Sequence, residues 1–278
     1  MTKIRDVKNF WEINPVAAQN IAEVQGTYDF FRKFDNIREA GNCEPYNFSN
    51  KIHNYSGSKG KFVLDVGCGN GYVLSHYAKY GAKVFGIDIT EKAIELTKER
   101  FRICDLKGDF KLTNGNEIPY PENHFDIVCS MGVLHHIEDP IPMIKEIHRV
   151  LKVDGELILM LYNKRSFRNH ITFRVRKYFG SSIYRGKDLQ FIRNMNDGND
   201  CPLAKVYSKK EMLELLSDFH EHKFIINKLP YKELFILSET NKYFKYVGKI
   251  LDKVLPSPSE NFLAKRFGWN LYCKARKK

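Results

Sequence analysis

The chain has 278 residues, of which 43% are hydrophobic and 28% charged, and its formal net charge is +12 at pH 7. This composition excludes an intrinsically disordered chain, which lacks the apolar surface needed to offset the entropy lost on ordering. It also excludes a small disulfide-stapled scaffold, because a chain of this length can bury a sizeable core unaided. No uncharged apolar run reaches about 18 residues, so we expect no membrane-spanning helix.

The cellular compartment is inferred from the N-terminus and the cysteines. Asp6 and Glu12 stand where a secretion signal needs an apolar core, so no signal peptide is predicted. The six cysteines lie far apart, without a CxxC pair, at positions 43, 68, 104, 129, 201 and 273. This spacing predicts reduced thiols in a cytoplasmic protein rather than a disulfide framework or a zinc site.

The positive charge is concentrated in the last part of the chain. Residues 1–60 have a net charge of +1 and residues 61–161 a net charge of −3, whereas residues 162–278 have a net charge of +14. This distribution indicates an anionic partner for the C-terminal part.

The predicted elements begin with helices and continue as an alternation of strands and helices. The first 55 residues are rich in aromatic side chains and are expected to form helices over the sheet edge. Apolar runs then predict buried strands at 61–66, 82–87, 110–112, 125–130 and 156–161. Helical patterns fall between them at 71–80, 90–103 (with Thr90 as N-cap) and 141–151, and Val153-Asp-Gly155 is predicted as a turn.

The alternation is interrupted twice in the C-terminal part. An arginine-rich helix ending at Gly180 is expected within 163–203, before a polar stretch at 194–202. The capping box Ser208-Lys-Lys-Glu211 opens a helix to about Phe219, followed by a strand at 223–229. A helix at 242–255 and a stop at Pro256-Ser-Pro258 follow, and 268–274 is the last predicted strand.

This order predicts an α/β fold with a doubly wound, Rossmann-like seven-stranded sheet. We expect an N-terminal helical lid at 1–55 and a nucleotide-binding core formed by 56–162, 204–229 and 266–278. A basic cap insertion at 163–203 and a second helical insertion at 230–265 complete the predicted organisation.

The most informative stretch is Val63-Leu-Asp-Val-Gly-Cys-Gly-Asn-Gly71. Glycines at 67, 69 and 71 after a buried strand permit a tight turn with its backbone close to a ligand. Asp88 ends the next strand, where a carboxylate can accept hydrogen bonds from both hydroxyls of a ribose.

Two classes of nucleotide use this arrangement. A dinucleotide loop of the form GxGxxG needs a glycine at position 72, which is Tyr72 here, and Asp65 would repel a diphosphate. Asp65 suits a cationic ligand that has an ammonium and a sulfonium but no phosphate, a description that fits S-adenosylmethionine. A nicotinamide-dependent dehydrogenase is the less favoured alternative.

At this point the sequence resembles the class I S-adenosylmethionine-dependent methyltransferases, in their ubiquinone-biosynthesis-like (methyltransferase type 11) branch. The resemblance is close over about 61–161 and looser over 207–229. Besides the glycine loop, it rests on Asn114-Gly-Asn-Glu-Ile-Pro-Tyr120, Phe125-Asp-Ile-Val128, Val133-Leu-His-His-Ile-Glu-Asp139 and Glu146-Ile-His-Arg-Val-Leu-Lys152.

The resemblance implies a set of cofactor-binding positions. Gly67, Cys68 and Gly69 would line the methionine part, together with Ser130 and Met131, and Asp88 would hold the ribose. Ile89 would pack on the adenine. Asn114, beside Gly115, stands where the family usually has an aspartate that bonds the adenine amino group.

Methyl transfer mainly requires the acceptor and the methyl group to be aligned in a dry pocket. A hydroxyl acceptor also needs a base, for which the candidates are His135 and His136, although either could instead only orient a loop. Tyr162 ends the fifth predicted strand, where the acceptor should approach. We see no clustered ligand set and expect no metal requirement.

The acceptor remains the least determined feature. Apolar and basic residues alternate at helical spacing in 167–179 (apolar Phe167, Ile171, Val175, Tyr178 and Phe179; basic Arg168, Arg174, Arg176 and Lys177) and again in 242–254. They are typical of solvated basic cap helices, of a pocket for an anionic acceptor, or of an interfacial helix on an anionic membrane. Nucleic acid is disfavoured, because no RNA-binding module is evident.

The preferred function is O-methylation of a small molecule or short peptide that bears negative charge. N- or C-methylation of a lipid- or quinone-like acceptor at a membrane surface, and a non-catalytic cofactor-binding protein, are the alternatives.

Overall fold

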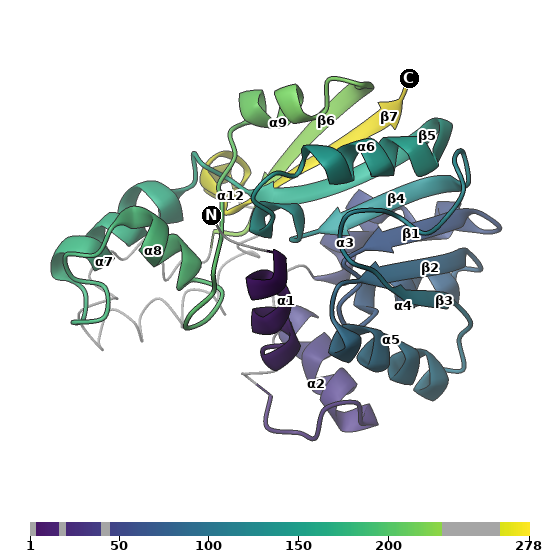
Figure 1. Ribbon diagram of the computed structural model, residues 1–278, viewed down its shortest axis with the longest axis horizontal. Helices are drawn as coiled ribbons and strands as arrows, with labels where there is room; N and C mark the ends of the chain where they lie inside the picture. The colour runs from purple at the N-terminus through teal and green to yellow at the C-terminus, as the bar shows by residue number, and fades with distance from the viewer. Residues whose placement is uncertain (1–3, 17–20, 40–44, 230–261) are drawn as a thin grey trace.

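The computed structural model describes residues 4–16, 21–39, 45–229 and 262–278. Its centre is a seven-stranded sheet with the order β3-β2-β1-β4-β5-β7-β6, in which β7 runs antiparallel to both of its neighbours (Figure 1). The predicted doubly wound, Rossmann-like fold is therefore confirmed. The strands are β1 Phe62–Val66, β2 Lys83–Asp88, β3 Asp109–Leu112, β4 Phe125–Met131, β5 Leu151–Tyr162, β6 Phe219–Asn227 and β7 Asn270–Lys277.

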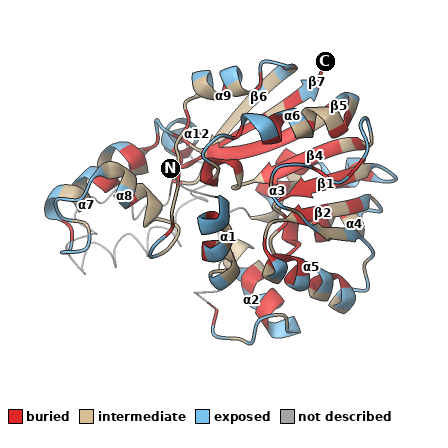
Figure 2. Cartoon of the chain, viewed as in Figure 1, coloured by how far each residue is buried: buried red, intermediate tan, exposed pale blue. Residues whose placement is uncertain are grey.

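Helices cover both faces of this sheet, and the strands between them are largely buried (Figure 2). On one face, α2, α3, α4 and α5 pack their apolar residues, including Phe30 and Tyr77, against the strands. On the other face, α6 and α9 do so with residues such as Ile147 and Met212. The main helices are α1 Ile4–Ile13, α2 Tyr28–Glu39, α3 Tyr46–His53, α4 Tyr72–Lys79, α5 Glu91–Ile103, α6 Ile141–Val150, α7 Phe173–Phe179, α8 Leu189–Asn194, α9 Lys209–Leu215 and α12 Phe262–Phe267.

The strand register determines where a ligand site can form. In the parallel part of the sheet, Val66 of β1 lies beside Ile87 of β2, and Asp65 lies beside Cys129 of β4. The carboxyl ends of these three strands therefore meet at one edge. The strand order changes direction at β1 and β4, which is where open α/β sheets bind their ligands.

Several predicted boundaries are wrong, and β-bulges explain the earlier starts of β5 and β6. The turn predicted at 153–155 is part of β5, where Asp154 has φ 59° and the pairing with β4 shifts register. The helix that starts with the capping box ends at Leu215 rather than Phe219, and β6 begins at Phe219 with Glu221 at φ 52°. A bulge lets a residue in the left-handed region remain inside a paired strand, so turn-like sequence does not end it.

The residues between β5 and α9 form a cap that extends beyond the carboxyl ends of the parallel strands (Figure 1). Its first helix starts with a π-helical turn, η4 (Arg168–Thr172), before α7. A π turn contains more residues than an α turn and so shifts the helical phase. Within α7, Phe173 is buried whereas Tyr178 and Phe179, on the other side of the helix, are exposed, which contradicts the continuous apolar face predicted for 167–179.

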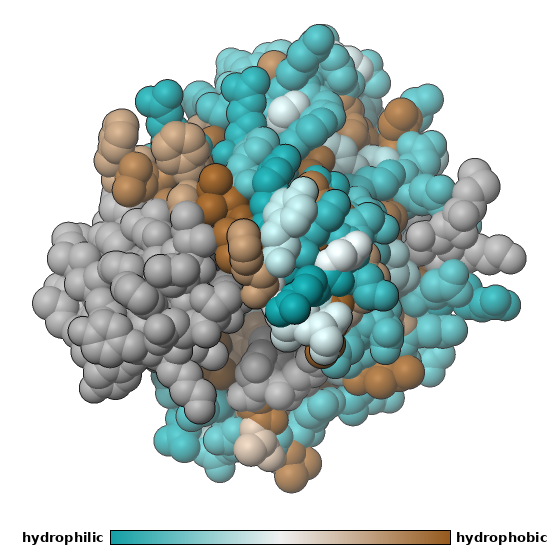
Figure 3. Space-filling view, turned by 90° about the vertical axis from the view of Figure 1, so that its left-hand side faces the viewer, coloured by the Kyte–Doolittle hydropathy of each residue, from teal (hydrophilic) through white to brown (hydrophobic). Residues whose placement is uncertain are grey.

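The second predicted insertion, with its helix at 242–255 and its stop at Pro256-Ser-Pro258, lies outside the described residues. Figure 3 views the molecule from the cap side, where hydrophilic surface predominates over the described residues and hydrophobic area gathers at one side. None of the helices in the described ranges is long and apolar enough to cross a bilayer.

Candidate functional site

A cavity of about 280 Å³ opens at the carboxyl ends of β1, β2 and β4, with α1 on its other side. Its walls contain both backbone from the strand ends and apolar side chains from α1. It is therefore a partly enclosed site of the size expected for a small ligand. Six of the predicted cofactor residues line it: Gly67, Gly69, Asp88, Ile89, Gly115 and Met131.

The glycine bend brings backbone against the cavity. Gly67, Gly69 and Gly71 have φ of 79°, 57° and 74°, in the region that favours glycine. A Cβ on Gly67 would lie 2.3 Å from Val133 Cγ2, so a larger residue would displace the loop after β4. The bend therefore needs glycine at this position for both its conformation and its packing.

Asp88 fixes the shape of this bend. One carboxylate oxygen, Oδ2, accepts a hydrogen bond from the Gly69 amide at 3.1 Å, and Oδ1 accepts from the amide and hydroxyl of Thr90 at 3.0 and 2.8 Å. Burial raises the pKa of Asp88, and these bonds act in the opposite direction. Asp88 therefore lines the cavity between the glycine bend and the N-terminus of α5, and accepts hydrogen bonds from both.

Asp65 lies behind the wall that Val66 and Gly67 form and does not itself line the cavity. Its carboxyl is 3% exposed, and Oδ1 has no hydrogen-bond partner. Burial raises the pKa of Asp65 to about 8. A buried carboxyl with an unbonded oxygen provides an environment in which a nearby cation is stabilised.

The other three predicted cofactor residues also lie outside the cavity lining. The Ser130 hydroxyl donates to the Val66 carbonyl, Cys68 lies with its sulfur 3.6 Å from the Thr97 hydroxyl, and Asn114 Oδ1 accepts from the Asn116 amide. Each supports a neighbouring part of the wall in this structure. Asn116, rather than Asn114, lines the cavity.

The structure separates the three candidate catalytic residues. His136 lines the cavity, and its ring lies 5.0 Å from that of Trp11. His135 is fully buried, and its ring is 3.8 Å from that of Tyr162. The Tyr162 hydroxyl donates to Asp197 Oδ1 at 2.5 Å. In this arrangement only His136 faces the cavity.

The side of the cavity formed by α1 was only partly foreseen from the sequence. A lid was predicted for the N-terminal segment, but its lining residues were not identified: Ile4, Val7, Trp11, Pro15 and Val16. Ile4, Val7 and Trp11 are apolar and lie at helical spacing, and this pattern could have indicated an apolar face of the helix.

Helix α1 is attached to the core by Glu12. Its carboxylate accepts hydrogen bonds from the backbone amides of Glu91 and Lys92, both at 2.9 Å, at the N-terminus of α5. These amides have no partner within the helix, so a carboxylate stabilises both them and the helix dipole. The contact holds α1 over the cavity.

We expect Glu12→Ala to loosen this closure, with cofactor dissociation faster by about tenfold and stability lower by about 1 kcal/mol. Stopped-flow displacement would measure the rate, and hydrogen exchange of residues 4–13 would report the attachment. Glu95→Ala, on the exposed side of α5, is the matched control. Equal dissociation rates for the two variants would contradict the role of Glu12.

The residues present fit a sulfonium nucleoside. The glycine bend admits a ligand close to backbone, Asp88 lies at the strand end predicted to hold a ribose, and the buried Asp65 has a carboxyl oxygen without a hydrogen-bond partner. Gly67, Gly69 and Met131 would hold the methionine end, and Ile89 and Gly115 the adenine.

Fold and site together resemble those of the class I S-adenosylmethionine-dependent methyltransferases. Residues 64–159 match the family described as "Methyltransferase domain". The resemblance derived from the sequence is confirmed, and S-adenosylmethionine is the cofactor that the family implies.

The chain is similar to a ubiquinone biosynthesis O-methyltransferase of Coxiella burnetii, with 33% identity over 138 residues, covering 49% of this chain and 58% of the relative. It thus spans somewhat more than half the length of that relative. Two solved structures share the fold. A SAM-dependent methyltransferase from Aquifex aeolicus has a TM-score of 0.53 and 19% identity, covering 92% of this chain and all of the other. One from Methanosarcina mazei has a TM-score of 0.55 and 22% identity, covering 82% and 96%.

Proposed function

We propose that this protein transfers the methyl group of S-adenosylmethionine to an oxygen of a small-molecule or short-peptide acceptor that bears negative charge. The observation that carries the proposal is the position of His136, which lines the same cavity as six of the predicted cofactor residues. Oxygen is preferred as the acceptor atom because a hydroxyl needs a base and because the relative named above is an O-methyltransferase.

S-adenosylmethionine supplies, when bound, a methyl group on a positively charged sulfur. The chain itself supplies the base. His136 Nδ1 lies 2.5 Å from the Leu203 carbonyl, which can only accept, so Nδ1 carries the proton and Nε2 has the lone pair. Burial lowers the pKa of His136, which keeps the imidazole neutral at neutral pH and able to accept a proton.

The negative charge of the acceptor is supported by the cap. Arg174 lies close enough to Arg193 to disfavour its positive charge, and burial and Arg174 together lower the pKa of Arg193. An anion between such groups is stabilised by both.

We also place the protein in the cytoplasm, since the five cysteines within the described ranges are free thiols.

The test is formation of S-adenosylhomocysteine with a panel of phenols, hydroxy acids and carboxylate-bearing peptides. We expect His136→Ala to lower kcat by a factor of about 100 or more while cofactor affinity changes less than about threefold. His135→Phe should keep most of the turnover, because the His135 ring does not line the cavity and phenylalanine preserves the stacking on Tyr162. His148→Asn, on α6 and away from the cavity, is the matched control.

Unchanged turnover in His136→Ala would exclude His136 as the base. Cofactor binding without turnover of any acceptor in the panel would instead favour a non-catalytic cofactor-binding protein.

A further inference from the structure

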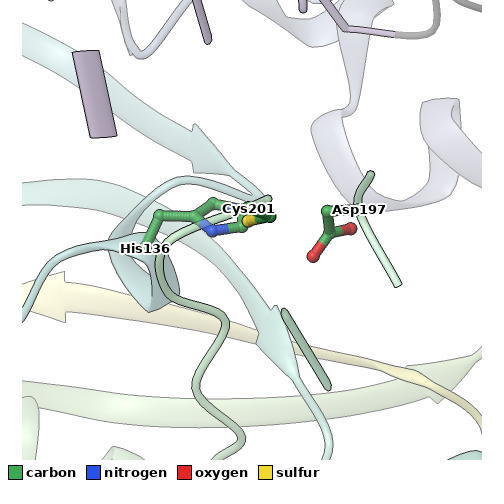
Figure 4. A group of neighbouring side chains, drawn as sticks. All are labelled: His136, Asp197 and Cys201. Carbon is green, nitrogen blue, oxygen red and sulfur yellow. The ribbon is translucent and has the colours of Figure 1, made fainter. Parts of the chain in front are cut away.

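Three side chains with metal-binding atoms meet where the cap joins the site. His136 lies in η3 (Leu134–His136) after β4, whereas Asp197 and Cys201 belong to the polar stretch of the cap, and Figure 4 shows them converging from these segments. One ligand atom from each side chain lies within 4.8 Å of the other two. We propose that this His136–Asp197–Cys201 cluster binds a zinc ion.

The imidazole of His136 makes the hydrogen bond that is typical of a metal-binding histidine. Its Nδ1 donates to the Leu203 carbonyl, which fixes the tautomer and leaves Nε2 as the free nitrogen. Histidines that bind metals commonly donate their second nitrogen to a backbone carbonyl in this way. The ring of Trp11 packs against that of His136 with a centroid distance of 5.0 Å and limits its rotation.

The carboxylate of Asp197 is held at one oxygen and open at the other. Tyr162 donates to Oδ1 at 2.5 Å, and the Asn196 side chain adds a weaker bond at 3.3 Å. Oδ2 is buried without a hydrogen-bond partner. A buried carboxylate oxygen left unpaired costs free energy, and a cation at this point would satisfy it.

Cys201, the third member of the cluster, lies in a loop whose two ends are held together by hydrogen bonds. The side chain of Asn194 donates to the Pro202 carbonyl and accepts from the Ala204 amide, both at 2.9 Å, and these bonds hold the loop ends together. Cys201 is 4% exposed, and its thiol donates to the Leu203 carbonyl at 3.7 Å. Metal binding would replace the thiol proton, which leaves to solvent as the thiolate binds the metal.

The donor set favours zinc. Imidazole nitrogen, thiolate sulfur and carboxylate oxygen are all ligands that Zn²⁺ takes at about 2.0–2.3 Å, whereas Mg²⁺ and Ca²⁺ prefer oxygen alone. Ligands at a tetrahedral ion lie about 3.5 Å apart, so the cluster must contract by about 1 Å. Asp197 is half-buried on a loop, and rotation of its side chain can supply this movement.

Three protein ligands leave a fourth position open, as in catalytic zinc sites. Because His136 also lines the cavity, a metal held by this cluster would be close to the cavity and would supply a site for water or an acceptor oxygen. This last step rests on the proposed function, whereas zinc binding does not. With zinc bound, His136 would be a ligand, and the role of base given to it in the proposed function applies to the chain without zinc.

Cobalt(II) is the probe, because a thiolate bound to it gives a near-ultraviolet charge-transfer band. The full chain is treated with a chelator, in a Cys104→Ser background that removes an exposed thiol. We expect one cobalt per chain with this band, displacement of cobalt by zinc, and release of about one proton per zinc.

Cys201→Ser should abolish the band, and Asp197→Asn should weaken cobalt binding by at least about tenfold. Cys273→Ser, which removes a buried thiol in β7, is the matched control and should keep the band. Absence of the band, or its persistence in Cys201→Ser, would overturn the zinc site.

Calorimetry with S-adenosylmethionine on the same samples separates the two proposals. Cofactor binding without the cobalt band contradicts the zinc site alone. The cobalt band without cofactor binding contradicts the proposed function alone.

Discussion

Asp88→Asn is expected to weaken S-adenosylmethionine binding by about 100-fold, or about 2.7 kcal/mol, and to lower the melting temperature as well. The carboxylate now accepts from three donors, the amide of Gly69 and the amide and hydroxyl of Thr90. An asparagine has only one side-chain oxygen that can accept a hydrogen bond. Its amide nitrogen, itself a donor, would stand where the second carboxylate oxygen now accepts one. The variant therefore loses both the charge offered to a ribose and the bond that shapes the glycine bend.

Isothermal titration would measure the affinity, and thermal unfolding without ligand would measure the separate effect on the bend. Glu91→Gln removes the same charge three residues away on the exposed first turn of α5, and we expect its affinity to stay within about threefold of the parent. Equal affinities for Asp88→Asn and the parent would remove Asp88 from the cofactor site.

Asp65→Asn is expected to change stability and cofactor binding in opposite directions. Burial raises the pKa of Asp65 from its ordinary 3.8 to about 8, so the folded chain binds more protons than the unfolded chain between these values. Stability contributed by this group is therefore lost as the pH rises from about 4 to about 8. Asparagine does not ionise, so the variant should melt at a higher temperature than the parent, by a margin that grows up to about pH 8.

Cofactor binding should show the reverse. An ammonium near Asp65 favours the ionised carboxylate, so binding near neutral pH releases a proton and the affinity of the parent rises with pH up to about 8. Asp65→Asn should bind at least about tenfold more weakly at pH 8 and lose this pH dependence. Calorimetry in buffers of different ionisation enthalpy would count the proton.

The contrast variant is Asp126→Asn on the neighbouring strand β4. Asp126 is paired with Lys152 at 2.7 Å, and despite partial burial the bonds from Lys152 and the Phe62 amide lower its pKa. We therefore expect this variant to lose stability at neutral pH and to bind the cofactor normally. A fall in stability for Asp65→Asn, with proton release unchanged, would show that Asp65 is not the group that titrates.

The sequence alone determined the features that rest on local chemistry. A buried apolar run followed by glycines at 67, 69 and 71 predicts a strand that ends in a tight bend, and Thr90 predicts the start of a helix. Both are found, because φ preference and N-capping depend on neighbouring residues only. The resemblance to methyltransferases followed from the same stretch, since Asp65, the glycines that follow its strand and Asp88 lie on or after adjacent parallel strands whose order is strongly constrained.

Only the tertiary structure decided which of these residues face the cavity and what joins them from elsewhere. His135 and His136 are adjacent in the chain, yet one is stacked on Tyr162 and the other lines the cavity. Glu12 meets α5 across 79 residues, and Cys201 and Asp197 reach His136 across more than 60 residues. Such contacts depend on how the lid and the cap pack on the sheet, and packing between distant segments leaves no periodic signal in the sequence.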